Sequence, residues 1–260
     1  MAVRTILDKR AGIAPRTLRR DLWWLQPAIT FVVLGGFVIY STWAAFQNAN
    51  YFADPYVSPF FSPCLASSCQ DHNVIPKVFG TWWAISPALI ILWFPLLFRG
   101  TCYYYRKAYY RAFFWSPPAC AVREPNKRYT GESKGVLLVQ NLHRYGFWLV
   151  IPFCVFLTWD AINAFFFPDG FHMGLGTLIL VANAILLTLY TFSCHTARHI
   201  FGGNVDRFSS APGRTWIWKR LTWLNERHML FAWSSLIVVA LADLYIRLVA
   251  TGTIHDPRFF

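Results

Sequence analysis

Five long apolar stretches constrain this chain more than any other feature of its sequence. They span about 27–49, 80–98, 145–167, 173–194 and 229–250. A helix needs roughly 20 mostly apolar residues to cross a bilayer, and each stretch is of that order. The first stretch lacks the short apolar core and small-residue cleavage site of a signal peptide, so we expect it to remain as a permanent span. The sequence therefore predicts an all-α integral membrane protein, a bundle of five transmembrane helices.

The distribution of positive charge predicts how this bundle is oriented. The 260 residues include 24 Lys and Arg against 12 Asp and Glu, a formal net charge of +12. Most of the cations lie in residues 1–26, 99–144 and 198–227. The positive-inside rule then places the N-terminus in the cytoplasm and the C-terminus outside. Because the cations are segregated to one membrane side, they indicate contact with anionic membrane lipids and exclude nucleic-acid binding as their main role.

The chain divides into three expected parts. Residues 1–26 form a basic cytoplasmic tail in which RRDLWWLQP predicts a short interfacial helix, residues 27–250 form the five-span anchor, and residues 251–260 form an outer tail. Pro87 and Pro95 are expected to bend the second span, because proline removes a helical hydrogen bond. The FPDGF segment predicts a tight outer turn, which makes the third and fourth spans an antiparallel pair.

The cysteines divide by compartment. Cys64 and Cys69 lie in the outer loop, where the environment is oxidising and a disulfide between them is the simplest interpretation. Cys102, Cys120 and Cys194 lie at the cytoplasmic membrane boundary, where thiols stay reduced. Reduced cysteines at such a place are more often metal-binding or catalytic than structural.

Four of the seven histidines lie at the same depth as these boundary cysteines. They come from three different spans and are His143, His195, His199 and His228. A bundle that directs imidazoles inward from facing helices is a common way to hold a cofactor. Two cofactors remain open on this evidence. Haem b needs axial imidazoles from different spans, whereas a Rieske-type 2Fe–2S cluster takes two histidines and two cysteines. The second of these uses the cysteines.

Ionisable residues within the spans suggest other functions. Asp160 lies in the third span, and Asp243 and Arg247 form an i, i+4 pair in the fifth. Intramembrane ionisable residues are functional candidates, so a small transporter that uses Asp160 and Asp243 is one alternative. A purely structural anchor, in which the cysteines and histidines only pack, is another.

Three segments carry a resemblance to a known family: GTCYYYRKAYYRAFFWSPPACAV, GVLLVQNLHRYGFW and SCHTARHIFGG. Together they resemble the membrane-anchor (C) subunit of succinate dehydrogenase, respiratory complex II, in the actinobacterial class whose anchor is a single five-span chain. HRYG and RH are also similar to the HR-x-x-G and G-x-RH elements of other complex II anchors. The resemblance covers about residues 27–250.

This resemblance implies a multi-pass subunit of the bacterial cell membrane that belongs to a succinate:quinone oxidoreductase. Succinate would be oxidised at a flavin in a separate soluble subunit, so no residue of this chain is expected to catalyse that step. Electrons would pass through a second soluble subunit, which carries iron–sulfur clusters, to quinone bound in the anchor. The quinone implied by the family is menaquinone. The chain would thus serve both the tricarboxylic acid cycle and the respiratory chain.

The resemblance also implies a cofactor, because this class is described as holding a membrane-embedded Rieske-type 2Fe–2S cluster where other anchors carry haem. On this basis Cys102 and Cys120 are expected to supply the two thiolates. Two imidazoles would come from among His143, His195 and His228, with His199 in a hydrogen-bonding role. The chain has no C-x-H motif, so its ligand order departs from that of soluble Rieske domains. Haem b remains the alternative.

The quinone would need an apolar slot near the cytoplasmic face and one or two hydrogen-bond donors. The expected donors are Gln140, Arg144 and Tyr145, and the expected lining residues are Tyr103 and Trp148. A basic face for the soluble iron–sulfur subunit is expected next to this slot. Its candidate residues are Arg106, Lys107, Arg111, Arg123 and Lys127.

Overall fold

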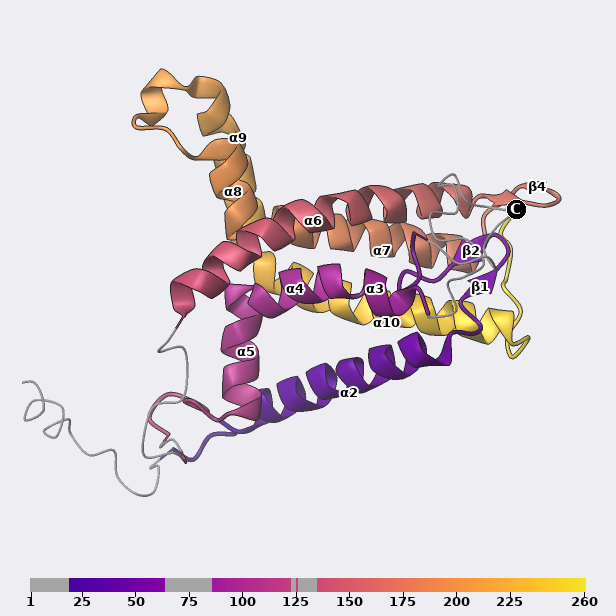
Figure 1. Ribbon diagram of the computed structural model, residues 1–260, viewed down its shortest axis with the longest axis horizontal. Coiled ribbons are helices and arrows are strands. Elements are labelled where there is room, and N and C mark those ends of the chain that lie inside the picture. The colour runs from indigo at the N-terminus through magenta and orange to yellow at the C-terminus, as the bar shows by residue number, and fades with distance from the viewer. Residues whose placement is uncertain (1–18, 64–85, 123–124, 126–134) are drawn as a thin grey trace, which may run out of the picture.

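The computed structural model describes residues 19–63, 86–122, 125 and 135–260. The regular secondary structure of this part is helical apart from two short β-hairpins, and loops connect these elements. The long helices run side by side in Figure 1 and form the bundle. They are α2 (Leu25–Gln47), α3 (Ala88–Ile91) continued by α4 (Trp93–Thr101), α6 (Val136–Asn163), α7 (Leu175–Phe192) and α10 (His228–Ala250).

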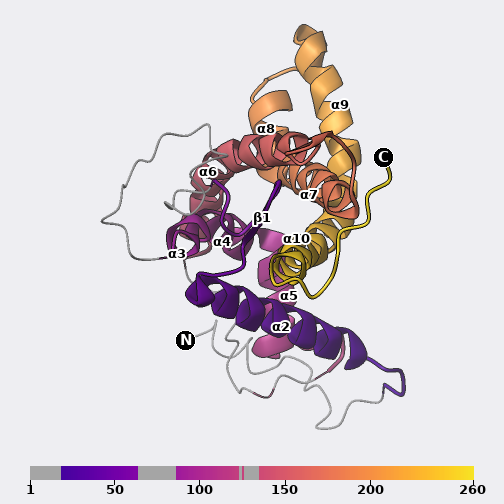
Figure 2. The ribbon, with the colours of Figure 1, turned by 90° about the vertical axis from the view of Figure 1, so that its right-hand side faces the viewer.

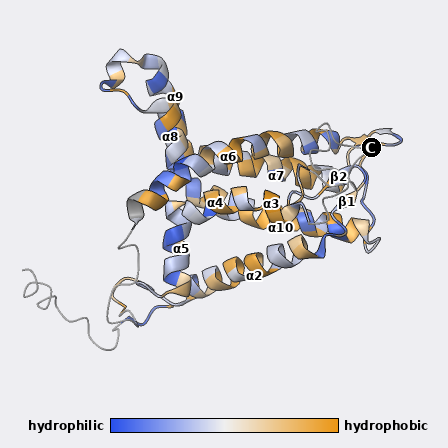
Figure 3. Cartoon of the chain, in the orientation of Figure 1, coloured by the Kyte–Doolittle hydropathy of each residue, from blue (hydrophilic) through white to orange (hydrophobic). Residues whose placement is uncertain are grey.

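Four of these helices are long and apolar enough to cross a membrane: α2, α6 from Leu138, α7 and α10. A fifth span is present if the bent pair of α3–α4 and α5 (Tyr103–Phe113) is counted as one. The structure therefore agrees with an integral membrane bundle of four to five candidate spans among the described residues. Figure 3 shows hydrophobic positions along the bundle helices, with hydrophilic positions on α5.

The second apolar stretch differs from the expected straight or proline-bent span. Its first residues, 80–85, lie outside the described part, and its helix continues past residue 98 to Thr101. Pro95 falls in the first turn of α4, where a missing backbone N–H is tolerated. The main bend, 81°, lies instead between α4 and α5, where Cys102 adopts an extended conformation with ψ 127°. Cys102 therefore sits at a change of chain direction.

The third and fourth spans are joined by the expected tight turn. The α6 helix begins at Val136, well before residue 145, and ends at Asn163. Strand β3 (Phe166–Phe167) then pairs antiparallel with β4 (Gly170–Phe171), and α7 follows. The two helices pack against each other along the bundle. At the same end, β1 (Phe52–Ala53) pairs with β2 (Tyr56–Val57).

The two ends of the bundle are built differently, and we name them by their elements. The C-terminal end carries both β-hairpins and the C-terminus (Figures 1 and 2). There the chain end is fixed to the start of α7, since the Phe259 amide donates to the Met173 carbonyl at 2.8 Å and Arg258 forms a β-bridge with Gly174.

The α5 end carries the helices that leave the bundle direction. Here α8 (His195–Gly202), the short 3-10 helix η3 (Phe208–Ser210) and α9 (Pro212–Glu226) project to one side of the bundle in both views (Figures 1 and 2). The expected interfacial helix in RRDLWWLQP is not present over residues 19–24, because the first described helix begins at Leu25. Residues 1–18 lie outside the described part.

Candidate metal centre

Two thiols and two imidazoles meet at the α5 end of the bundle. The Cys102 Sγ atom lies 3.4 Å from His228 Nε2, and the Cys194 Sγ atom lies 3.1 Å from His143 Nε2. The four residues come from the α4–α5 bend, the α7–α8 junction, α6 and the first turn of α10. We call Cys102, Cys194, His143 and His228 the thiol–imidazole cluster.

Both cysteines are placed by a change of chain direction at a helix start. Cys102 is the N-cap of α5 and Cys194 is the N-cap of α8, and both have extended backbone conformations. The Cys194 sulfur accepts a hydrogen bond from the Thr196 amide at 3.2 Å. Backbone amides at a helix N-terminus favour negative charge on these sulfurs, whereas burial disfavours it, so a bound cation would be needed to hold either cysteine as a thiolate. A thiolate is the form that binds a metal ion.

The histidines are held by their other ring nitrogen. His143 Nδ1 lies 3.0 Å from the Phe98 carbonyl oxygen, which can only accept, so Nδ1 carries the proton and Nε2 presents its lone pair. Ser193 Oγ donates to the Tyr190 carbonyl at 2.9 Å and lies 2.7 Å from His228 Nδ1. Because the serine proton is already used, His228 Nδ1 donates, and its Nε2 is also free to bind. Such outer partners are typical of metal-ligating histidines.

Three members of the cluster are buried, and the fourth, His228, is partly exposed and packs against an aromatic ring. Cys102, Cys194 and His143 are 3%, 2% and 8% exposed. The Phe98 ring stacks on His143 with centroids 4.6 Å apart, and the Tyr190 ring stacks on His228 at 5.2 Å. A dry, low-dielectric shell of this kind controls solvent access and the reduction potential of a bound redox centre.

The donors of the cluster can be compared with the ligand sets of known metal centres. Within the described residues, no three His, Cys, Asp or Glu side chains converge on a point that suits a single ion. The shortest contacts instead form two thiol–imidazole pairs. A 2Fe–2S cluster takes two protein ligands per iron, and two His with two Cys is the Rieske set. The residues present therefore fit such a cluster in kind and number.

Two of the expected metal ligands lie apart from this group. Cys120 is exposed, and its carbonyl oxygen accepts a hydrogen bond from Arg19 at 2.8 Å. His195 is also exposed, and its ring contacts His199 with centroids 4.4 Å apart. Burial and the neighbouring cations His199 and Arg198 lower the pKa of His195. Cys194 occupies the place that the sequence analysis gave to Cys120. The outer Cys64 and Cys69 lie outside the described residues.

The five residues expected at a quinone site lie on the outer surface of α5 and α6. Tyr103, Tyr145 and Trp148 are 62%, 67% and 51% exposed, and Gln140 and Arg144 are exposed as well. Gln140, Arg144 and Trp148 follow the i, i+4, i+8 spacing of one helix face. In this chain alone they face outward, toward lipid or a neighbouring subunit. Of the expected basic face, Arg123 and Lys127 lie outside the described part.

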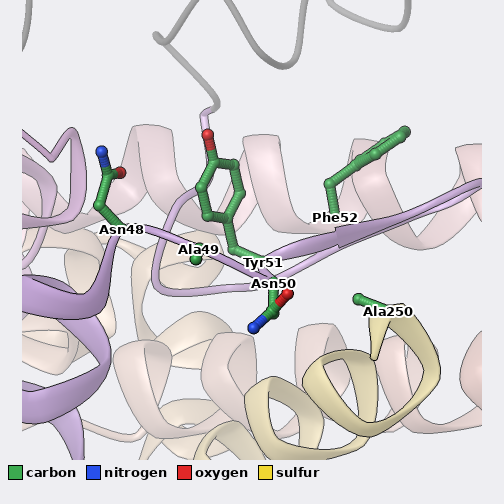
Figure 4. A pocket seen from close by; sticks show the side chains of 6 residues that line it. All are labelled: Asn48, Ala49, Asn50, Tyr51, Phe52 and Ala250. Carbon is green, nitrogen blue, oxygen red and sulfur yellow. The ribbon is translucent and has the colours of Figure 1, made fainter. Parts of the chain in front are cut away.

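Two hollows lie elsewhere on the bundle. One is a mostly apolar groove of about 350 Å³ on α6 and α7, lined by Ile151, Cys154, Val155, Thr158, Trp159, Ile162, Thr188 and Phe192. The other measures about 270 Å³ at the C-terminal end (Figure 4), lined by Asn48, Ala49, Asn50, Tyr51, Phe52 and Ala250. Neither hollow includes a member of the thiol–imidazole cluster or of the expected quinone site.

The intramembrane charges form a separate network toward the C-terminal end. Asp243 accepts hydrogen bonds from Arg247 Nε at 2.7 Å, from Tyr40 at 2.6 Å and from Ser58. Asp160 accepts a hydrogen bond from Ser62. Asp243 is thus neutralised within its own helix, and both aspartates fix the segment that follows β2 against the bundle.

Comparisons with known proteins decide the family. The model of the family described as actinobacterial succinate dehydrogenase subunit SdhC matches residues 25–252. The chain belongs to this family. Among solved structures, it is similar to a chain of the Mycobacterium smegmatis Sdh1 complex in the apo form, with 48% identity over 97% of both chains and a TM-score of 0.85. Among curated proteins, none matches significantly.

This membership confirms the coarser part of the resemblance. The chain is a membrane-anchor subunit of an actinobacterial succinate dehydrogenase, a multi-pass protein that works with the other subunits of that complex. The comparisons name no cofactor and no quinone for it. The feature that Cys102 and Cys194 share becomes visible only in the structure. Both cysteines directly precede a helix that leaves the direction of a span.

Proposed function

We propose that this chain passes electrons from the soluble iron–sulfur subunit to quinone in the membrane through a Rieske-type 2Fe–2S cluster. The proposed ligands are Cys102, Cys194, His143 and His228. The observation that carries the proposal is that both histidines direct an Nε2 lone pair at a cysteine sulfur while their Nδ1 atoms are held elsewhere. When bound, such a cluster accepts and releases one electron at a time.

The residues of this chain would prepare the site for that role. The carbonyl of Phe98 and the hydroxyl of Ser193 fix the histidine tautomers, so no proton has to move before an imidazole binds iron. The helix starts at Cys102 and Cys194 would help to stabilise both sulfurs as thiolates once a cluster is bound. The rings of Phe98 and Tyr190 exclude water from the histidines.

Haem b, the alternative cofactor, is less well supported by this arrangement. An axial histidine presents its free nitrogen to haem iron, whereas here each Nε2 faces a sulfur within 3.4 Å. Haem ligation would leave two buried cysteines without a role. A transporter function is also less well supported, because Asp243 is already paired with Arg247.

For quinone, the proposal retains the exposed residues of α5 and α6 as candidates. Gln140, Arg144 and Tyr145 would donate to the quinone oxygens, and Tyr103 and Trp148 would line the slot. Because all five face outward, the proposed slot is closed by lipid or by the soluble iron–sulfur subunit. Menaquinone remains the expected substrate, and the α5 end is proposed to face the cytoplasm.

The proposal is tested by separating succinate oxidation from quinone reduction in the assembled complex. We expect Cys194→Ser to abolish succinate-driven quinone reduction while the soluble subunits still reduce an artificial dye with succinate. Cys120→Ser is the matched control and should keep both activities. Full quinone reduction in Cys194→Ser, or its loss in Cys120→Ser alone, would overturn the proposed ligand set.

A further inference from the structure

Arg99 is a cation that points into the bundle beside the thiol–imidazole cluster. It lies in the last turn of α4, three residues before Cys102. Its Nη1 donates to the Tyr105 hydroxyl at 2.6 Å, and its Nη2 donates to Ser235 Oγ on α10 at 2.9 Å. Ser235 is fully buried. The guanidinium is therefore directed at the interior of the bundle, away from lipid headgroups.

The guanidinium is linked to the proposed metal site through one aromatic ring. Its Cζ atom lies 4.5 Å from the centroid of Tyr190, and the same ring stacks on His228 at 5.2 Å. His228 in turn contacts the Cys102 sulfur.

No carboxylate balances this charge within the described residues. The hydrogen-bond acceptors of Arg99 are the neutral oxygens of Tyr105, Ser235 and the Ala232 carbonyl. The ion pairs found in the described ranges all involve other residues. Buried charges in proteins are normally paired or lie beside a bound ion of opposite charge. The missing negative charge is therefore expected on something that the site binds.

A reduced cluster supplies a charge of that sign. Two ferric ions, two sulfides, two thiolates and two neutral imidazoles sum to zero, so the addition of one electron leaves a net negative charge. The reduction potential of an iron–sulfur cluster depends on the charges and hydrogen bonds around it. A nearby uncompensated cation stabilises the reduced form over the oxidised form.

We propose that Arg99 is a positioning residue that raises the reduction potential of the cluster by stabilising the negative charge added on reduction. This inference rests on the proposed function, since it requires a cluster at Cys102, Cys194, His143 and His228. It assigns Arg99 a role in how readily an electron enters the site, separate from iron binding itself.

The test is a redox titration of the purified complex, followed by electron paramagnetic resonance. Arg99→Gln and Arg99→Met remove the charge, Arg99→Lys keeps it without the guanidinium geometry, and Arg207→Gln removes an exposed charge from the α8–α9 loop. We expect both neutral variants to keep the cluster signal and to shift its midpoint downward by at least about 59 mV, a tenfold change for a one-electron couple. The midpoint of Arg99→Lys should stay nearer to that of the wild type, and the midpoint of Arg207→Gln should equal that of the wild type.

The outcomes separate this inference from the function on which it rests. Absence of a 2Fe–2S signal with the low average g value of histidine-ligated clusters in the wild type overturns both. A wild-type signal with unchanged midpoints in the neutral variants overturns the role of Arg99 alone. Equal shifts in Lys and the neutral variants would mean that the hydrogen bonds matter and the charge does not. Loss of the cluster in the neutral variants, with or without loss in Arg99→Lys, would also overturn the proposal, because Arg99 would then be required for iron binding itself.

Discussion

Two sets of polar side chains in this bundle can be compared: the network around Asp243 and the thiol–imidazole cluster. They differ in whether their members satisfy each other's charge and hydrogen bonds. The network around Asp243 joins a carboxylate to a guanidinium, and Arg247 also donates to Gln47 at 2.6 Å and to the Ala49 carbonyl at 2.7 Å. About 22 Å away along α10, fifteen residues at 1.5 Å each, His228 begins the thiol–imidazole cluster. There the contacts join soft sulfur atoms to imidazole lone pairs.

This difference separates a network that holds the fold together from a set of side chains that can bind a cofactor. The charges of Asp243 and Arg247 satisfy each other, so their network acts as a clamp between α2, α10 and the segment after β2. The thiol–imidazole cluster instead presents ligand atoms whose best partner is a metal ion. The sequence analysis already favoured the cysteines and histidines over Asp243, and in the structure Asp243 is paired with Arg247.

The largest expected effect concerns iron. Replacing Cys102 or Cys194 by serine should reduce the iron and sulfide content of the anchor to background, because a serine oxygen is a poor substitute for a soft thiolate. Elemental analysis of the purified complex measures this as a loss of about two iron and two sulfide per complex relative to wild type, since the clusters of the soluble iron–sulfur subunit remain, and Cys120→Ser is the control that shows no loss. Normal iron content in both variants would contradict a metal-binding role for the thiol–imidazole cluster.

The next effect concerns folding and should leave iron unaffected. Asp243→Ala leaves Arg247 buried without its partner, and breaking a buried ion pair in this way costs about 3–5 kcal/mol. We expect a clear loss of stability in denaturant titrations of the detergent-solubilised complex, with normal iron in the folded fraction. Asp206→Ala, at an exposed loop position, is the control. A stable Asp243→Ala protein that has lost the iron of the anchor would contradict the structural role given to Asp243.

A smaller effect is expected from the partners that hold the histidines. Ser193→Ala removes the acceptor for His228 Nδ1, and loss of such a partner typically costs about 10–100-fold in metal affinity. The rate of iron loss to a chelator measures this. Ser234→Ala, whose hydroxyl bonds to the Leu230 carbonyl of its own helix, should behave as wild type. Equal resistance in both variants would show that His228 needs no support from Ser193.

Much of the fold and part of the site could be predicted from the sequence. Length and hydropathy locate the helices, and the shared depth of His143 and His228 brings them to one level. The choice between Cys120 and Cys194 could not be predicted, because both follow a span and lie near basic residues. What separates them is chain direction, since Cys194 caps a helix at the bundle edge whereas Cys120 follows α5 in an exposed turn.

The smallest expected effect is electrostatic and lies at the C-terminal end. The hydrogen bond from Arg258 lowers the pKa of Asp169, so this pair stabilises the fold above the unfolded pKa of about 3.9 and the contribution is lost as the pH falls through the lower folded value. Asp169→Asn should lower the thermal midpoint slightly at pH 7 and less at pH 3. A difference that grows toward pH 3 would contradict this pairing.

The most direct test of a histidine-ligated 2Fe–2S cluster in the anchor is pulsed electron paramagnetic resonance on the reduced complex labelled with nitrogen-15 histidine. We predict a 2Fe–2S signal with the low average g value of histidine-ligated clusters, coupled to two labelled imidazole nitrogens. His143→Ala or His228→Ala should remove one coupling or the whole signal. A cluster signal without histidine coupling, or a low-spin ferric haem signal in its place, would contradict the account.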